Sequence, residues 1–219
     1  MLKIVVFDCG YGGEFFADSW EDAFPTIQVI RVIDWRHAAE YLISSRKSRK
    51  LALEALRPYI GRVDLIILAN YLLSATSLKY FRKTFKNQKF IGLSFKEPDT
   101  FVKKNTIILT TKAITRTIAY RHYLFKIKRR PIVITPDSWL AKIDDGILTR
   151  QEIADTIHDN CHANFPPEEI ILACSHFNDI KADLRHILSH NVKIYDSFND
   201  TIREAARILR IRGGVPKQK

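Results

Sequence analysis

The stretch L-K-I-V-V-F-D-C-G-Y-G-G, residues 2–13, decides the fold class. Residues 2–7 are mostly apolar and rich in β-branched side chains, which is typical of a buried strand. Asp8 and Cys9 follow this strand, and the glycines within residues 10–13 predict a loop after it. A buried strand that ends in polar residues and a glycine-rich loop is typical of a parallel α/β sheet, whose ligands bind beyond the carboxyl ends of the strands.

Strand-like runs and amphipathic stretches alternate outward from this segment along the whole chain. Further strands are predicted at 27–33, 64–68, 90–93, 106–109, 132–135, 170–173 and 192–195. Helices are predicted at 48–60, 74–85, 114–124, 150–158, 178–188 and 196–209. We expect Ser or Thr within Ser74–Ser77 to cap the second of these helices, and Asp196 or Ser197 to cap the last.

This alternation predicts an α/β fold with parallel sheets and right-handed crossovers. The pattern restarts after the middle of the chain, so we expect two α/β lobes. The first would be residues 1–95 plus 198–219, and the second residues 96–197. The two halves show no clear sequence repeat, and the polar tail at 212–219 is expected to fray.

The charge of the chain favours anionic partners. Its 219 residues include 35 basic and 24 acidic ones, a net charge of +11, and 46% are hydrophobic, which is enough for a full core. The basic residues gather in three clusters: Arg46, Lys47, Arg49 and Lys50; Lys79, Arg82, Lys83 and Lys86; Lys126, Lys128, Arg129 and Arg130. Two interpretations stay open, solvated surfaces or a polyanion site. Aromatic residues are not interleaved with these clusters, so no motif indicates nucleic acid.

Three scattered cysteines make a disulfide framework improbable and favour a reducing cytoplasm. No apolar run reaches the roughly 20 residues of a membrane helix, and no signal peptide precedes the first strand, so no membrane partner is expected. His158, Cys161 and His162 have a spacing that could hold a metal, but a solvated helix end is the favoured interpretation. No metal and no cofactor are expected.

A second segment, L-A-C-S-H-F at residues 172–177, places a cysteine at the predicted end of a buried strand. There Cys174 would lie near the N-terminus of the next helix, which favours the thiolate. His176, two residues later, could relay a proton. The alternative is a buried structural cysteine beside a capping histidine.

Taken together, these segments resemble the aspartate/glutamate racemase superfamily. The motif Asp8-Cys9-Gly10-Tyr11-Gly12-Gly13 is similar to D-S-G-x-G-G of glutamate racemases, and Cys174-Ser175-His176 is similar to their C-T-H. Further matches, in the same order along the chain, are Asp34 after the second strand, Leu68-Ala69-Asn70-Tyr71 where the family has A-C-N-T, and Glu97-Pro98 where it has E-P.

The resemblance implies two pseudo-symmetric lobes with the active site in the cleft between them. In this family one thiol from each lobe flanks the α-carbon of a small carboxylate or amino acid, and the reaction needs no cofactor. One thiolate removes the α-proton, and the other thiol protonates the opposite face. The resemblance also implies a homodimer and a role in peptidoglycan supply.

The chain departs from this pattern at the first thiol, because the family alignment puts Ala69 there. Four alternatives follow. The protein could be a single-thiol isomerase, lyase or decarboxylase, or a racemase in which Cys9 or Asp8 replaces the lost acid/base. It could instead be an inactive homologue that binds an anionic partner, or Ala69 could be a replacement introduced to trap substrate.

The expected site combines residues from both lobes. Cys174 is the expected acid/base, His176 tunes or reloads it, and Asp8 assists on the opposite face. Substrate binding is expected from Cys9, Gly12, Gly13, Asn70, Thr111 and Ser175.

Overall fold

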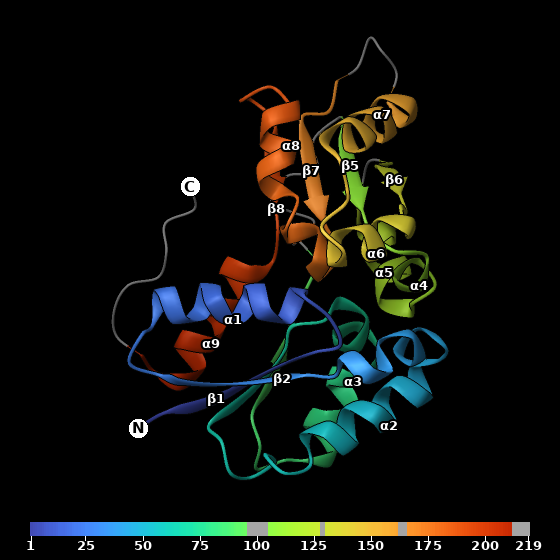
Figure 1. The fold of residues 1–219 in the computed structure, drawn as a ribbon. Coiled ribbons are helices and arrows are strands. Elements are labelled where there is room, and N and C mark those ends of the chain that lie inside the picture. Colours follow the sequence, from blue (N-terminus) through green and yellow to red (C-terminus); the bar gives the residue numbers. More distant parts are fainter. Residues whose placement is uncertain (96–104, 128–129, 162–165, 212–219) are drawn as a thin grey trace. The chain divides into compact units, whose positions relative to one another are not determined.

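The computed structural model describes residues 1–95, 105–127, 130–161 and 166–211 (Figure 1). The chain divides into two compact units. Unit 1 is Met1–Ser94 with the chain from Ser197 onward, and unit 2 is Phe95–Asp196. Each unit has a four-stranded parallel sheet with helices packed around it, so the predicted α/β fold with two parallel sheets is confirmed.

The sheet of unit 1 has the order β2-β1-β3-β4. Its strands are β1 (Lys3–Asp8), β2 (Gln28–Ile33), β3 (Leu65–Leu68) and β4 (Phe90–Gly92). Its helices are α1 (Gly12–Ala23), the 3-10 segment η1 (Trp35–Leu42), α2 (Ser45–Leu56), α3 (Tyr71–Thr84) and α9 (Phe198–Leu209).

The core of unit 1 follows from strand alternation. Val5 and Phe7 of β1 and Ile66 and Leu68 of β3 belong to one hydrophobic cluster, together with side chains of α2 and α3. On α1 and α9, which lie side by side in Figure 1, the rings of Phe16 and Phe198 meet edge to face at 5.1 Å. Both faces of the sheet are therefore covered, which explains the near-continuous apolar strands.

Unit 2 repeats this topology with the order β6-β5-β7-β8. Its strands are β5 (Thr106–Leu109), β6 (Ile132–Ile134), β7 (Glu169–Leu172) and β8 (Lys193–Tyr195). Its helices are α4 (Lys112–Thr115), α5 (Ile118–Lys126), α6 (Ser138–Asp144), α7 (Arg150–Asn160), the 3-10 turn η3 (Ser175–Asn178) and α8 (Lys181–Ile187).

Several predicted elements were wrong in detail. The loop expected at the glycines is in fact the start of α1, so Gly12 and Gly13 form its first turn; α1, η1 and α6 were not predicted. The predicted helix at 114–124 is two helices, because Thr117 caps a new one after α4 ends. The helix expected from Asn178 begins at Lys181, after the turn η3.

Two predicted caps were also wrong. The segment Ser74–Ser77 lies inside α3, whose N-cap is Asn70, and the Ser74 hydroxyl donates to the Leu68 carbonyl at 3.0 Å. Ser197 occupies the N-cap position of α9 without a side-chain capping bond, and Asp196 pairs with Lys181 instead. Glu97-Pro98, Lys128, Arg129, His162 and the tail at 212–219 lie outside the described residues. Across the described part of the chain, no helix is long and apolar enough to cross a bilayer.

Candidate functional site

The carboxyl ends of β1 and β3 bring three predicted site residues of unit 1 together. Asp8, the last residue of β1, is fully buried, and its Oδ1 accepts the Asn70 side-chain amide at 2.7 Å and the Cys9 backbone N–H at 2.6 Å. The Asn70 amide also lies 3.4 Å from the Cys9 sulfur. Because the Asn70 Oδ1 accepts the Leu73 N–H at 2.9 Å, one side chain caps α3 and orients both Asp8 and Cys9.

Gly13 allows α1 to begin against this strand end. A Cβ at Gly13 would lie 2.5 Å from the Asp8 Cβ and 2.6 Å from the Ile33 Cδ1, so any side chain there would displace one of them. The Gly13 N–H donates to the Gly10 carbonyl at 3.2 Å, so this amide has an acceptor within its own turn. Gly12 is the first residue of α1 and is buried.

A second group of polar residues lies beyond β2 and was not recognised from the sequence, apart from Asp34. The Asp34 carboxylate accepts the Tyr41 hydroxyl at 2.8 Å and faces His37 Nδ1 at 2.8 Å. Asp34 is tied to the site strand, because its N–H donates to the Asp8 carbonyl at 3.0 Å. Burial, reinforced by the bond to Asp34 and the nearby Cys9 and Asp8, raises the pKa of Tyr41. Tyr41 therefore stays a neutral hydrogen-bond donor at all ordinary pH values.

Unit 2 places Cys174 at the corresponding end of its own sheet. Cys174 lies two residues beyond β7, is 7% exposed and belongs to the hydrophobic cluster of the unit. It occupies the N-cap position of η3, and the Phe177 N–H donates to the Cys174 carbonyl at 3.2 Å. The expected transition from strand to helix is therefore a single 3-10 turn, in which Ser175 is also buried.

His176 has a carboxylate partner that the sequence did not reveal. Its Nε2 lies 3.5 Å from Asp144 Oδ1, and the His176 side chain is 14% exposed. Burial raises the pKa of Asp144, the neighbouring Asp145 raises it further, and the charge of His176 opposes both. Asp144 is the last residue of α6, a helix that was not predicted, so its pairing with His176 became visible only in the fold.

Two threonines complete this edge of unit 2. The Thr110 hydroxyl donates to the Ala173 carbonyl at 3.3 Å, next to Cys174. Thr111 is buried, and its hydroxyl oxygen accepts the Ile114 N–H at 3.4 Å as the cap of α4. The Thr111 hydroxyl proton is not used by this cap, so it can still be donated to a ligand oxygen.

The strand registers show which residues of the two sheets occupy equivalent positions. Phe7 pairs with Leu68 in one sheet and Leu109 with Leu172 in the other. The next residues, Ala69 and Ala173, each donate a backbone N–H at 2.8 Å, to the carbonyls of Phe7 and Leu109 respectively.

Each of these alanines is followed by the N-cap of the next helical segment, which is Asn70 in unit 1 and Cys174 in unit 2. The sequences show the same equivalence: residues 66–70 are I-I-L-A-N and residues 170–174 are I-I-L-A-C. This short repeat was not recognised from the sequence. By register, the position in unit 1 that matches the Cys174 thiol is Asn70, whereas the family alignment puts Ala69 there.

The predicted residues thus form two groups. Asp8, Cys9, Gly13 and Asn70 lie together in unit 1. In unit 2 the second group consists of Cys174, Ser175 and His176 in and beside η3. All three cysteines are thiols, and within the described ranges no three His, Cys, Asp or Glu side chains are grouped as metal ligands.

Comparisons of the sequence and of the structure both find glutamate racemases. No family model matches the chain. Glutamate racemases of Clostridium perfringens and Buchnera aphidicola are each 24% identical to it; the matches cover 93% and 91% of this chain and 81% of each relative.

Solved structures of racemases match nearly the whole chain. The glutamate racemase of Escherichia coli, in complex with L-glutamate and the activator UDP-MurNAc-Ala, matches with a TM-score of 0.85 at 17% identity and covers 100% of this chain and 85% of its own. That of Francisella tularensis, with D-glutamate, matches at 0.74 and 19% identity, covering 100% and 84%. The aspartate racemase of Picrophilus torridus matches at 0.56 and 13%, covering 94% and 92%. The chain therefore has the fold of glutamate racemases, and its sequence resembles the aspartate/glutamate racemase superfamily over most of its length.

Proposed function

We propose that this protein transfers a proton at the α-carbon of a small carboxylate or amino acid, without a cofactor, and that Cys174 is the acid/base. The observation that carries the proposal is the pairing by register: a buried thiol at the end of β7 and, at the matching position after β3, the amide of Asn70. An amide does not exchange protons at the rate that catalysis needs, so the proposed chemistry is one-sided.

In this proposal the Cys174 thiolate removes the α-proton and forms the S–H bond. The electron pair of the broken C–H bond moves toward the substrate carboxylate, whose growing negative charge must be stabilised by fixed donors. Thr111, with its unused hydroxyl proton, and Ser175 are the proposed donors in unit 2. The thiol then returns its proton to the same face of the carbon.

His176 is proposed to pass protons to and from the Cys174 thiol. Its Nε2 lies 3.5 Å from Oδ1 of the Asp144 carboxylate, which orients the ring. At the strand ends of unit 1, Asp8 and Asn70 are proposed to act as a fixed pair. The Asn70 amide orients the Asp8 carboxylate.

A second candidate is two-sided racemisation with Cys9 as the other acid/base. The specific observation is that the Cys9 sulfur lies 3.4 Å from the Asn70 amide nitrogen, so a thiol does lie next to the position that matches Cys174. In this alternative the Cys174 thiolate removes the α-proton, the Cys9 thiol delivers another proton to the same carbon, and the product has inverted configuration.

Proton NMR in deuterated water tests both candidates. The protein is incubated separately with D- and L-glutamate and D- and L-aspartate. Loss of the α-proton signal without formation of the other enantiomer supports one-sided transfer, and loss with inversion supports the Cys9 candidate. If none of the four substrates exchanges, the proposed substrate class is wrong, and binding of an anionic ligand remains the function to test.

Two cysteine variants assign the chemistry. Cys174→Ser should abolish exchange, and exchange that persists in this variant contradicts the role of Cys174. Cys161→Ser is the matched control: Cys161 is a half-buried thiol at the end of α7, and its loss should leave exchange unchanged. Cys9→Ser should leave one-sided exchange intact but abolish any inversion.

A further inference from the structure

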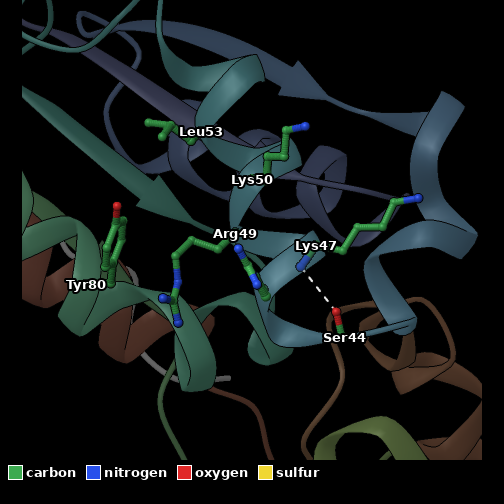
Figure 2. A pocket seen from close by; sticks show the side chains of 7 residues that line it. Ser44, Lys47, Arg49, Lys50, Leu53 and Tyr80 are labelled. Atoms are coloured by element: carbon green, nitrogen blue, oxygen red, sulfur yellow. Dashed lines mark hydrogen bonds between the residues drawn. The ribbon is translucent and has the colours of Figure 1, made fainter.

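Unit 1 has a hollow between α2 and α3 that the proposed reaction does not use. It has a volume of about 610 Å³, and all but one of its lining residues lie in or directly before α2 (Figure 2). These residues are Ser44, Arg46, Lys47, Arg49, Lys50 and Leu53, joined by Tyr80 from α3. The volume lies within the roughly 300–1,000 Å³ range of small-ligand sites.

The four basic side chains of the hollow stand at the positive end of α2. Arg46, Lys47, Arg49 and Lys50 fall within its first two turns, and the first turn has no acidic residue. The two cations of the first turn, Arg46 and Lys47, face the positive end of the helix dipole, which is an unfavourable arrangement for a cation. Helix stability alone therefore does not account for these cations. Together with the positive end of the helix dipole, they attract an anionic ligand.

Ion pairs within the protein offset only part of this charge. The Lys47 ammonium pairs with Glu40, and Lys50 lies 3.8 Å from Glu54, both exposed pairs that contribute little. The adjoining helix adds charge and no counter-charge: α3 contains Lys79, Arg82 and Lys83 and no Asp or Glu. A solvated surface normally mixes both signs, whereas the residues that line the hollow include four cations and no carboxylate.

Arg49 and Tyr80 determine what kind of anion fits. The Arg49 guanidinium carbon lies 4.5 Å from the centre of the Tyr80 ring, and its Nη2 donates to the Thr76 carbonyl at 3.0 Å. Figure 2 shows Arg49 directed toward Tyr80, while Lys47 and Lys50 extend in another direction from α2. A ring already covered by a guanidinium is a poor stacking surface for a base, so the hollow is suited to charge and not to base recognition.

We propose that this hollow and the adjoining basic surface of α3 bind consecutive phosphates of a linear phosphate chain. The shared chemistry is a row of phosphate monoanions, supplied either by inorganic polyphosphate or by the backbone of a single-stranded nucleic acid. Arg46 and Lys50, one helical turn apart and exposed, make the phosphate contacts, and Arg49, held against the Tyr80 ring, adds a fixed charge. Binding is independent of base sequence.

The test uses the full chain with two probes, a fluorescein-labelled oligothymidylate and inorganic polyphosphate as its competitor. Anisotropy is measured over a series of salt concentrations. Each single-strand phosphate contact contributes about −0.7 to the slope of log affinity against log salt, so Arg46→Gln/Lys50→Gln should make the slope less steep by about 1.4. Arg46→Glu/Lys50→Glu should abolish binding.

The control is Lys3→Gln/Arg62→Gln, which removes two exposed charges near the amino ends of β1 and β3, away from the start of α2. The control should keep the wild-type slope, and an equal loss in the control and in the α2 variant overturns the proposal in favour of a general charge effect. Absence of binding to both probes at low salt overturns it as well. Displacement of the oligonucleotide by polyphosphate supports the shared chemistry. The same titration with fluorescein-labelled polyphosphate identifies polyphosphate as the source if this probe binds and the oligonucleotide does not.

Both α2 variants remove cations from the positive end of a helix and should therefore fold, as circular dichroism will show. If one does not fold, the other still provides the comparison. Proton exchange at the substrate α-carbon should be unchanged in the glutamine variant, so failure of this proposal and failure of the proposed function give different results.

Discussion

The amide of Asn70 holds the strand end of unit 1 together. Its oxygen caps α3, and its nitrogen donates to a fully buried carboxylate and faces a thiol. Replacing it by aspartate keeps the capping oxygen and the shape but exchanges the donor for a carboxylate oxygen that faces Asp8.

Asn70→Asp should lower the free energy of unfolding at pH 7 by about 3 kcal/mol, because two carboxylates then face each other without a proton between them. The loss should be smaller at pH 4 than at pH 7, because a proton shared between the two carboxyl groups removes their repulsion. Urea denaturation at both pH values measures it. Asn105→Asp, which removes one donor to the Pro166 carbonyl at an exposed position, is the control and should cost far less. Equal losses in the two variants would refute the role assigned to Asn70.

Asp144 provides a second prediction at the scale of one residue. Its pKa is raised mainly by burial, so the folded state holds the proton more tightly than the unfolded state does. The ionised carboxylate therefore costs stability above its folded pKa, and the cost disappears as the pH falls below the unfolded value of 3.8.

Asp144→Asn should consequently leave stability at pH 7 unchanged or slightly higher, while slowing proton exchange about 10-fold to 100-fold through loss of the His176 orientation. Chemical denaturation at pH 7 and the exchange rate are measured on the same preparation. Unfolding of the variant at pH 7 would show that Asp144 is structural, and an unchanged exchange rate would show that His176 does not need it.

Part of the site could be predicted from single residues. Asp8, Cys174 and His176 follow apolar runs, and polar side chains at strand ends are the signal for a site in parallel sheets. Asp144 could not be predicted, because its pairing depends on where an unpredicted helix ends. The same holds for the contacts of Tyr41 and His37 with Asp34, which depend on η1.

Elements were predicted where periodicity was strong and missed where capping decides the boundary. The predicted strands lie within one or two residues of those observed, because buried parallel strands are continuous apolar runs. The start of α3 was predicted three residues late, because the capping role of Asn70 was not recognised. The helix α1 was missed, because two glycines at its start are a typical loop signal.

The capping box of α7 allows a test at this scale. The Thr149 hydroxyl accepts the Glu152 N–H at 3.2 Å, and the Glu152 carboxylate accepts the Thr149 N–H at 3.1 Å. Thr149→Ala should lower the free energy of unfolding by about 1 kcal/mol. Thr156→Ala, whose hydroxyl bonds back to the Glu152 carbonyl inside the same helix, should be neutral or slightly stabilising.

The same box predicts a dependence on pH. Bonds from Lys142 first, and then from Thr149, lower the pKa of Glu152 from 4.5 to about 2. A depressed carboxyl pKa contributes stability that is present above 4.5 and is lost as the pH falls toward 2. Thr149→Ala should therefore show a weaker loss of stability in this acid range than Thr156→Ala. Identical acid profiles for the two variants would contradict the box.

At the scale of the whole molecule, the two units are the same four-stranded topology used twice. Alternating strands and helices predicted two parallel sheets, and the family resemblance implied two pseudo-symmetric lobes, but the repeat in the sequence was not recognised. It survives in sequence only as the I-I-L-A runs at 66–69 and 170–173, since these buried strand positions constrain side chains more than helix surfaces do. Colinear motifs across the chain, and not any single one of them, carried the prediction of the superfamily.

The repeat predicts where a second thiol would work. Asn70→Cys places a thiol at the register position of Cys174 and should add inversion to exchange, a gain of about 10²–10⁴-fold in racemisation. Ala69→Cys places the thiol at a fully buried position and should only destabilise the fold. Chiral chromatography of the product measures both. Inversion in Ala69→Cys and not in Asn70→Cys would favour the family alignment over the sheet register.

The central claim is that Cys174 exchanges the substrate α-proton on one face only. The most direct measurement is the stereochemical course of exchange of the unmodified protein in deuterated water, with NMR for deuterium uptake and chiral chromatography for configuration. The account predicts deuterium at the α-carbon with retained configuration. Inverted product forming as fast as deuterium enters would contradict it.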